Sequence, residues 1–144
     1  MTQCYVFDID GTVSDCSHRV HHITKSPKDW KAFFAADGAD EPITHMVDLA
    51  LHLAKVAPVV FVTARPAEWR ASTVAWLARQ YLSGPVYMRA IGDRRDDNIV
   101  KSELIDQVIA DGFEPIMAFE YRTRVVKMLR ARGIPCAQVA EGDF

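Results

Sequence analysis

The sequence predicts an α/β protein with a Rossmann-like parallel sheet of about five strands, helices on both faces of the sheet, and a small insertion after the first strand. Short apolar runs alternate with amphipathic segments along the chain, and proline or glycine stands at most boundaries between them. The composition, 49% hydrophobic and 25% charged residues, is that of an ordinary globular protein. A length of 144 residues is most simply one domain, residues 1–144.

The first predicted strand covers residues 3–9 and carries two carboxylates, Asp8 and Asp10, followed by glycine and threonine. Because successive strand residues point to opposite faces, Asp8 and Asp10 are expected to leave the strand tip on the same side. Residues 14–41 lack a helical period and are mostly polar, apart from a short helix predicted at 27–34 with a proline in its first turn and an aromatic face. We interpret residues 14–41 as a small lid or substrate-selecting insert over the strand tip.

The rest of the chain alternates helices and strands. Pro42 opens a predicted helix with an apolar residue every three or four positions, and Pro58 ends it. The continuous apolar run Val59–Val62 is typical of a strand covered on both faces. The following elements are predicted in order: a turn at 63–66, a helix over 66–82, a strand at 86–88, a helix from about 100 to 112, a strand at 115–119, a helix around 125–129 and a last strand through 137–139.

Polar residues follow several of these strands. In open parallel sheets, ligands bind outside the carboxyl ends of the strands. This rule places one set of side chains on a common rim: Asp8, Asp10, Thr63, Arg65 and the segment 120–122.

Two of these carboxylates suit phosphoryl transfer. Asp8 is the candidate nucleophile, which would form an aspartyl phosphate, and Asp10 is the candidate general acid and base. A phosphate beside carboxylates needs a divalent cation and fixed donors to offset repulsion. Thr63 offers a hydroxyl and Lys101 an ammonium for that purpose.

These residues resemble the first three motifs of the haloacid dehalogenase superfamily of phosphohydrolases: Asp8-Ile9-Asp10-Gly11-Thr12 after an apolar strand, Thr63 after another, and Lys101. The resemblance implies a haloacid dehalogenase-like fold and Mg²⁺ as cofactor.

The chain is most similar within that superfamily to the 3'-phosphatase domain of phage-type polynucleotide kinases. Arg19 falls where that domain has an arginine for the substrate phosphate, and Thr63-Ala64-Arg65 resembles its Ser-Gly-Arg turn. The segments 96–101, 122–128 and 138–144 are similar as well. The resemblance implies Mg²⁺-dependent hydrolysis of a phosphomonoester on a nucleotide or polynucleotide end, with Arg19 and Arg65 as substrate contacts. Without a GxxxxGK[ST] loop, kinase activity is not supported.

One position departs from the family pattern. The fourth motif carries Asp-Asp-Arg or Glu-Asp-Arg, whereas this chain has Glu120, Tyr121 and Arg122. The aspartate expected at Tyr121 is commonly a metal ligand, and a phenol with a pKa of about 10 is a poor substitute. Glu120 is the candidate replacement, so the expected magnesium ligands are Asp8, Asp10 and Glu120.

Three functions stay open at this point. The first is the polynucleotide 3'-phosphatase, and the second is a phosphatase of free nucleotides or other small phosphometabolites. The third is a weakly active or inactive relative that binds a phosphorylated ligand, because of Tyr121. The aromatic residues of the insert, Trp30, Phe33 and Phe34, either pack on the domain or stack on bases.

Charge and cysteine content exclude several protein classes. A net charge of −2 and a pI near 6.2 argue against coating long nucleic acid, although a local basic cleft is compatible with them. Cys4, Cys16 and Cys136 are scattered and show neither a disulfide framework nor zinc-site spacing. No leader or membrane-spanning run is evident, so we expect a cytoplasmic protein without membrane partners.

Overall fold

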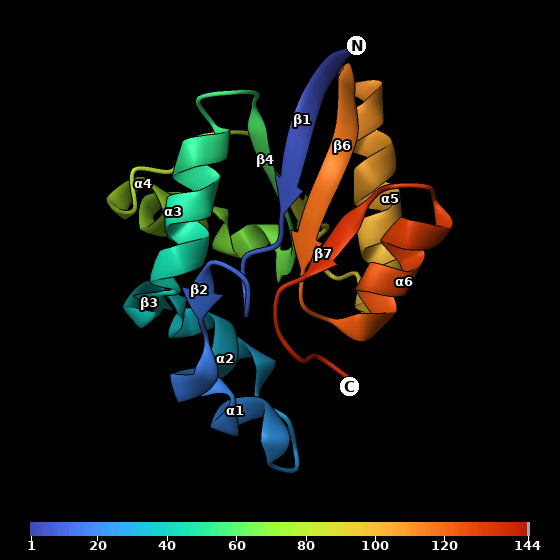
Figure 1. Cartoon of the computed structure of the whole chain (residues 1–144). Coiled ribbons are helices and arrows are strands. Elements are labelled where there is room, and N and C mark those ends of the chain that lie inside the picture. The colour runs from blue at the N-terminus through green and yellow to red at the C-terminus, as the bar shows by residue number, and fades with distance from the viewer. Residues whose placement is uncertain (144) are drawn as a thin grey trace.

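The computed structural model describes residues 1–143, and these form a five-stranded parallel sheet with helices on both faces (Figure 1). The predicted α/β fold is therefore confirmed. The first strand, β1, lies in the middle of the sheet. In spatial order the strands are β5 (Val86–Arg89), β4 (Val59–Pro66), β1 (Thr2–Phe7), β6 (Phe113–Glu120) and β7 (Cys136–Gln138).

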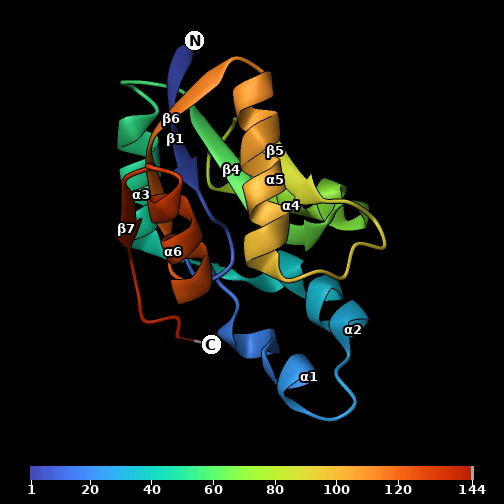
Figure 2. The same cartoon turned by 90° about the vertical axis from the view of Figure 1, so that its right-hand side faces the viewer.

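Each face of the sheet has its own apolar core. The helices α5 (Asp97–Ala110) and α6 (Thr123–Ala131) cover one face and lie side by side in Figure 2, while α3 (Thr44–Leu53) and α4 (Arg70–Arg79) cover the other. The apolar run at the start of β4 serves both cores. Val60 and Val62 pack with α5 on one face, and Val59 and Phe61 pack with α3 and α4 on the other. Because alternate side chains point to opposite faces and both faces are covered, every residue of the run is apolar.

The insertion after β1 contains more structure than the sequence indicated. Its helix α2 (Trp30–Ala35) was predicted, although it begins after Asp29 and not at Pro27. The other elements were not predicted: β2 (Ser14–Asp15), the 3₁₀ turn η1 (Ser17–Arg19), α1 (His21–Thr24), the 3₁₀ turn η2 (Asp37–Ala39) and β3 (Glu41–Pro42). Figure 1 shows this insertion beyond the carboxyl ends of the sheet strands.

Several predicted boundaries of helices and strands were wrong, because strand pairing extends into segments that were predicted as a helix or a turn. Pro42 does not open a helix, because β3 pairs antiparallel with β2 through Ser14 and Pro42, and α3 begins at Thr44. The predicted turn at 63–66 continues β4, which pairs with β5 as far as Pro66 across an irregularity in register. The 3₁₀ turn η3 (Ala67–Trp69) then precedes α4. Within residues 1–143, no helix is long and apolar enough to cross a membrane.

Candidate active site

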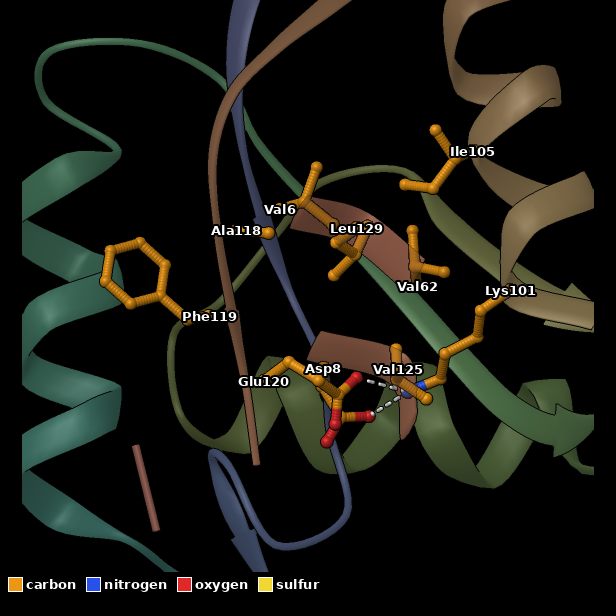
Figure 3. Close-up of a pocket in the computed structure, with 10 residues that line it drawn as sticks. All are labelled: Val6, Asp8, Val62, Lys101, Ile105, Ala118, Phe119, Glu120, Val125 and Leu129. Atoms are coloured by element: carbon orange, nitrogen blue, oxygen red, sulfur yellow. Dashed lines mark hydrogen bonds and ion pairs between the residues drawn. The ribbon is translucent and has the colours of Figure 1, made fainter. Parts of the chain in front are cut away.

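The carboxyl end of the central strand carries Asp8, one residue beyond β1, with a side chain that is 5% exposed. Lys101 reaches it from α5 and donates hydrogen bonds to Asp8 Oδ1 at 2.7 Å and to Glu120 Oε2 at 2.6 Å. Thr12 Oγ1 donates to Asp8 Oδ2 at 2.9 Å. Figure 3 shows Asp8, Glu120 and Lys101 meeting at the end of a small cavity with apolar walls. Three elements distant in sequence therefore converge on Asp8.

This group holds two buried carboxyl groups against one ammonium. Burial and the charge of Glu120 together raise the pKa of Asp8 to about 8, against the opposing effect of Lys101. Burial would lower the pKa of Lys101, but Asp8 and Glu120 outweigh that effect and raise it above its usual range. Asp8 and Glu120 share the single Lys101 ammonium, and a divalent cation beside Asp8 would fit the donor chemistry.

Glu120 ends β6 with its side chain held by protein groups. Its Oε1 accepts hydrogen bonds from the backbone N–H of Tyr121 at 3.0 Å and of Arg122 at 3.2 Å, while Oε2 faces Lys101. Among the residues that the structure describes, no group of three or more His, Cys, Asp or Glu side chains gathers as a metal cage. Glu120 as a metal ligand therefore stays a prediction.

Asp10 belongs to a second cluster, built on two arginines. Arg19 Nη2 and Arg65 Nη2 each lie 2.6 Å from Asp10 Oδ1. Both guanidinium groups are buried, and the Asp10 side chain is 21% exposed. Burial would raise the pKa of Asp10, but Arg65 and Arg19 outweigh it and lower the pKa to about 2. Asp10 is therefore ionised at neutral pH in this arrangement.

Asp8 and Asp10 have different hydrogen-bond partners, although the charge of Asp10 is near enough to raise the pKa of Asp8. The strand ends at Phe7 and not at residue 9, so Asp8 and Asp10 follow the strand and do not obey its period. Asp8 faces Lys101, whereas Asp10 faces Arg19 and Arg65. The sequence identified both residues but not their different surroundings.

Asp40, from the end of the insertion, completes the arginine cluster and was missed. Its carboxylate accepts hydrogen bonds from Arg19 Nε at 2.8 Å and Nη2 at 2.7 Å, and from Arg65 Nη2 at 3.4 Å. The Ser14 hydroxyl and His18 Nε2 also contact it. Asp40 therefore ties the insertion to the site. The sequence offered only an indirect signal for Asp40: an arginine that is buried requires a carboxylate partner.

Thr63 lies in the second half of the neighbouring strand, β4. Phe7 pairs with Phe61, so Thr63 is one residue beyond the level of Asp8 along β4. The Thr63 side chain is 1% exposed, and its Oγ1 accepts a hydrogen bond from the Arg65 N–H at 3.2 Å. The structure thus places Thr63 on the same rim as Asp8.

Tyr121 packs on Gly11, in the turn that follows the two aspartates. A Cβ added at Gly11 would lie 2.5 Å from a ring carbon of Tyr121, and the φ of Gly11 is +82°. Glycine is therefore required there both for space and for backbone conformation. Burial, together with the charge of nearby Asp8, raises the pKa of the Tyr121 phenol above its usual range. The phenol is neutral at physiological pH.

Two aspartates, Asp96 and Asp97, stand at the start of α5, and no side-chain capping bond from Asp96 occurs within residues 1–143. Asp97 Oδ2 instead accepts a hydrogen bond from Arg122 Nη1 at 2.5 Å. The buried Asp97 Oδ1 has no hydrogen-bond partner among the described residues. Asp97 lies one helical turn before Lys101, on the side of α5 that faces the site.

Comparisons with known proteins identify relatives of this chain. Residues 2–144 match the family model of the polynucleotide kinase PNKP phosphatase domain; residue 144 lies outside the described part of the structure. A chain of the Pnkp1/Rnl/Hen1 RNA repair complex is 26% identical, with a TM-score of 0.81 over 100% of this chain and 44% of that chain. This chain thus spans less than half of that relative's length.

More distant structures share the fold. A haloacid dehalogenase-like hydrolase from Streptococcus pneumoniae has a TM-score of 0.69 at 15% identity, covering 94% of this chain and 83% of its own. A class C acid phosphatase from Bacillus anthracis, with tungstate bound, has a TM-score of 0.64 at 12% identity over 96% of this chain and 68% of its own. The chain therefore belongs to the polynucleotide kinase PNKP phosphatase domain family, and it is a phosphatase with the haloacid dehalogenase fold.

Proposed function

We propose that this phosphatase hydrolyses the 3'-phosphate of a polynucleotide through an aspartyl-phosphate at Asp8, with Mg²⁺ as cofactor. The observation that carries the proposal is the placement of Asp8 at the end of the central strand, in contact with Lys101 and Thr12. Asp10 follows two residues later beside two arginines. Nucleic-acid ends as the substrate class are supported by the family and by the similarity to a chain of an RNA repair complex.

The reaction has two balanced steps. An Asp8 carboxylate oxygen forms a bond to phosphorus while the bond from phosphorus to the 3'-oxygen breaks, and Asp10 supplies the proton that the leaving oxygen takes. In the second step Asp10 removes a proton from water, which displaces Asp8 and releases phosphate. Lys101 and Thr63 hold phosphate oxygens during both steps.

The arginine cluster prepares Asp10 for the first step. In the free protein Asp10 is ionised, because its pKa is lowered to about 2 by Arg65 and Arg19 against the effect of burial. A bound phosphate takes hydrogen bonds from Arg19 and Arg65 and brings negative charge close to Asp10. Both changes raise the pKa of Asp10 and allow it to hold the proton that it donates.

Mg²⁺ would supply positive charge between the phosphate and Asp8. Asp8, Asp10 and Glu120 are its proposed ligands, and Asp8 fits because it shares the single Lys101 ammonium with Glu120. Asp10 and Glu120 would have to exchange contacts that they make with protein groups. Titration of the protein with Mg²⁺ should raise the Tm of the wild type, and by less in Asp8→Asn.

Replacement of Asp8 by Asn tests the proposed mechanism. With p-nitrophenyl phosphate and Mg²⁺, kcat should fall by at least about a thousandfold, because the amide is not a nucleophile. Far-UV circular dichroism should be unchanged, and Asp106→Asn, at an exposed carboxylate, is the matched control. Full activity of Asp8→Asn would remove Asp8 from the mechanism. Comparing a 3'-phosphorylated oligonucleotide with mononucleotides separates the polynucleotide enzyme from a phosphatase of small metabolites.

A second candidate, a weakly active relative that binds phosphorylated ligands, is favoured by the neutral phenol of Tyr121 beside the site. The comparison is the wild type against Tyr121→Asp. In a weakly active relative, the added carboxylate should strengthen Mg²⁺ binding and increase kcat. Equal turnover of both proteins would exclude this candidate.

A further inference from the structure

Three aromatic side chains form a row at the rim of the insertion, here called the aromatic row: Trp30 and Phe34 on α2, and Trp69 at the end of η3. The Trp30 and Phe34 rings are stacked, with centroids 6.0 Å apart, and the Phe34 and Trp69 centroids are 6.4 Å apart. Trp30 is 48% exposed, and Phe34 and Trp69 are partly exposed. The row therefore presents aromatic surface to solvent, although each ring also contacts a neighbour.

The aromatic row is connected to the arginine cluster through one side chain, Phe33. Phe33 packs edge-on against Phe34, with centroids 5.1 Å apart, and lies under the Arg19 guanidinium at 4.3 Å. Arg19 in turn contacts Asp10. At the other end of the row, Trp69 follows β4, the strand that holds Arg65. A ligand whose phosphate lies at the arginines thus has aromatic surface one residue layer away.

The charge around the row is positive although the protein as a whole is acidic. Between Ser17 and Ala35 the chain carries three exposed lysines, Lys25, Lys28 and Lys31, and a single carboxylate, Asp29, in a protein of net charge −2, while the buried Arg19 is paired with Asp10 and Asp40. The Lys28 ammonium lies 5.8 Å from the centre of the Trp30 ring. Exposed aromatic rings among lysines favour a polyanion with flat groups, which describes single-stranded nucleic acid.

We propose that the aromatic row binds bases of a single-stranded oligonucleotide next to its terminal phosphate. The proposal rests on the proposed function and adds where the substrate strand lies. The terminal phosphate would sit at Asp8, and the preceding nucleotides would run over α2, with bases on Trp30 and Trp69 and backbone phosphates near Lys28. A paired strand would hide its base faces, so the row favours single-stranded ends.

The test compares two substrates in matched variants. The probes are an oligothymidylate with a 3'-phosphate and p-nitrophenyl phosphate, which has no base. The measured quantity is the ratio of kcat/KM for the oligonucleotide to kcat/KM for p-nitrophenyl phosphate. Trp30→Ala and Trp69→Ala should each lower this ratio about tenfold, the effect of one lost base stack, and Trp30→Phe should restore most of it.

Tyr81 provides the control, because it is an aromatic residue 87% exposed beyond the far end of α4. Its φ is +60°, a conformation that asparagine tolerates, so the variant is Tyr81→Asn. This variant should leave the ratio unchanged. An unchanged ratio in Trp30→Ala would overturn the proposal, as would a parallel loss on both substrates, which would indicate that Trp30 acts through folding of the insertion.

A binding measurement separates this proposal from the proposed function. Oligothymidylate with a 3'-hydroxyl should quench tryptophan fluorescence, mainly from Trp30 and Trp69 because Trp76 is buried. Quenching that is weakened in Trp30→Ala supports the row even if the wild type hydrolyses no phosphomonoester. Absence of quenching overturns the row even if hydrolysis is intact. A dimer in sedimentation that Trp30→Ala dissociates, with oligonucleotide binding unaffected, would assign the surface to a second copy and overturn the proposal.

Discussion

Asp8 and Asp10 are two residues apart, yet their surroundings move their pKa values in opposite directions. Burial and Glu120 raise the pKa of Asp8 to about 8, whereas the arginines beside Asp10 outweigh burial and lower its pKa to about 2. The proposed roles need the opposite order, an ionised nucleophile and a protonated acid. In our proposal, bound Mg²⁺ lowers the pKa of Asp8 and the substrate phosphate raises that of Asp10. Ligand binding would thus activate both groups.

Asp40 should contribute strongly to stability at the residue scale. Its replacement by Ala removes a buried carboxylate from Arg19 and Arg65, which are themselves buried. We expect the free energy of unfolding to fall by about 3–5 kcal/mol in urea denaturation, because uncompensated buried charges are costly. Asp106→Ala, which removes an exposed ion pair with Arg132, should change it by less than about 1 kcal/mol. Similar losses in the two variants would contradict this account of Asp40.

At the scale of elements, the periodic segments and the helix α2 were predictable, and the other elements of the insertion were not. The apolar run from Val59 and the amphipathic face of α3 depend on local pattern, and both occur close to their predicted places. The strands β2 and β3 have two residues each, too few to show a period. They exist because Ser14 and Pro42 meet in the folded chain, which no local pattern records.

The helix α2 should depend on its N-cap. Asp29 accepts a hydrogen bond from the Ala32 N–H at 3.0 Å, and α2 has only six residues. Asp29→Ala should destabilise α2 by about 0.5–2 kcal/mol, which corresponds to roughly 2- to 30-fold faster amide exchange if the helix opens locally. Hydrogen exchange with mass spectrometry over residues 30–35 measures this. Asp48→Ala, an exposed carboxylate of α3, is the control, and equal exchange in both proteins would show that the cap does not hold α2.

For the whole molecule, the sheet topology decides where the chemistry lies. The central position of β1 puts Asp8 between the ends of β4 and β6, which bring Thr63 and Glu120. The helix α5 crosses one face and delivers Lys101, and the insertion closes the rim with Asp40. Global stability is therefore linked to the ionisation of groups at this rim.

Acid should weaken the fold partly through Asp10. Its folded pKa of about 2, lowered by the arginines against burial, lies below an unfolded value of about 3.9. The ionised group therefore contributes about 2–3 kcal/mol above pH 4, which is lost as the pH falls from about 4 to about 2. Urea denaturation between pH 2 and 5 should show that the stability difference between wild type and Asp10→Asn shrinks over this range. A difference independent of pH would contradict the assignment.

The sequence by itself determined the fold class and pointed to Asp8 and Asp10 as candidate nucleophile and acid, with Thr63 and Lys101 as candidate partners, because short motifs and apolar periodicity are local properties. It also identified Arg19 and Arg65 as members of the site. Only the tertiary structure decided that Asp10 lies among arginines, that Asp40 holds them, and that Tyr121 covers Gly11. These contacts join residues far apart in the chain, and burial then sets their charges, so no local pattern could have revealed them.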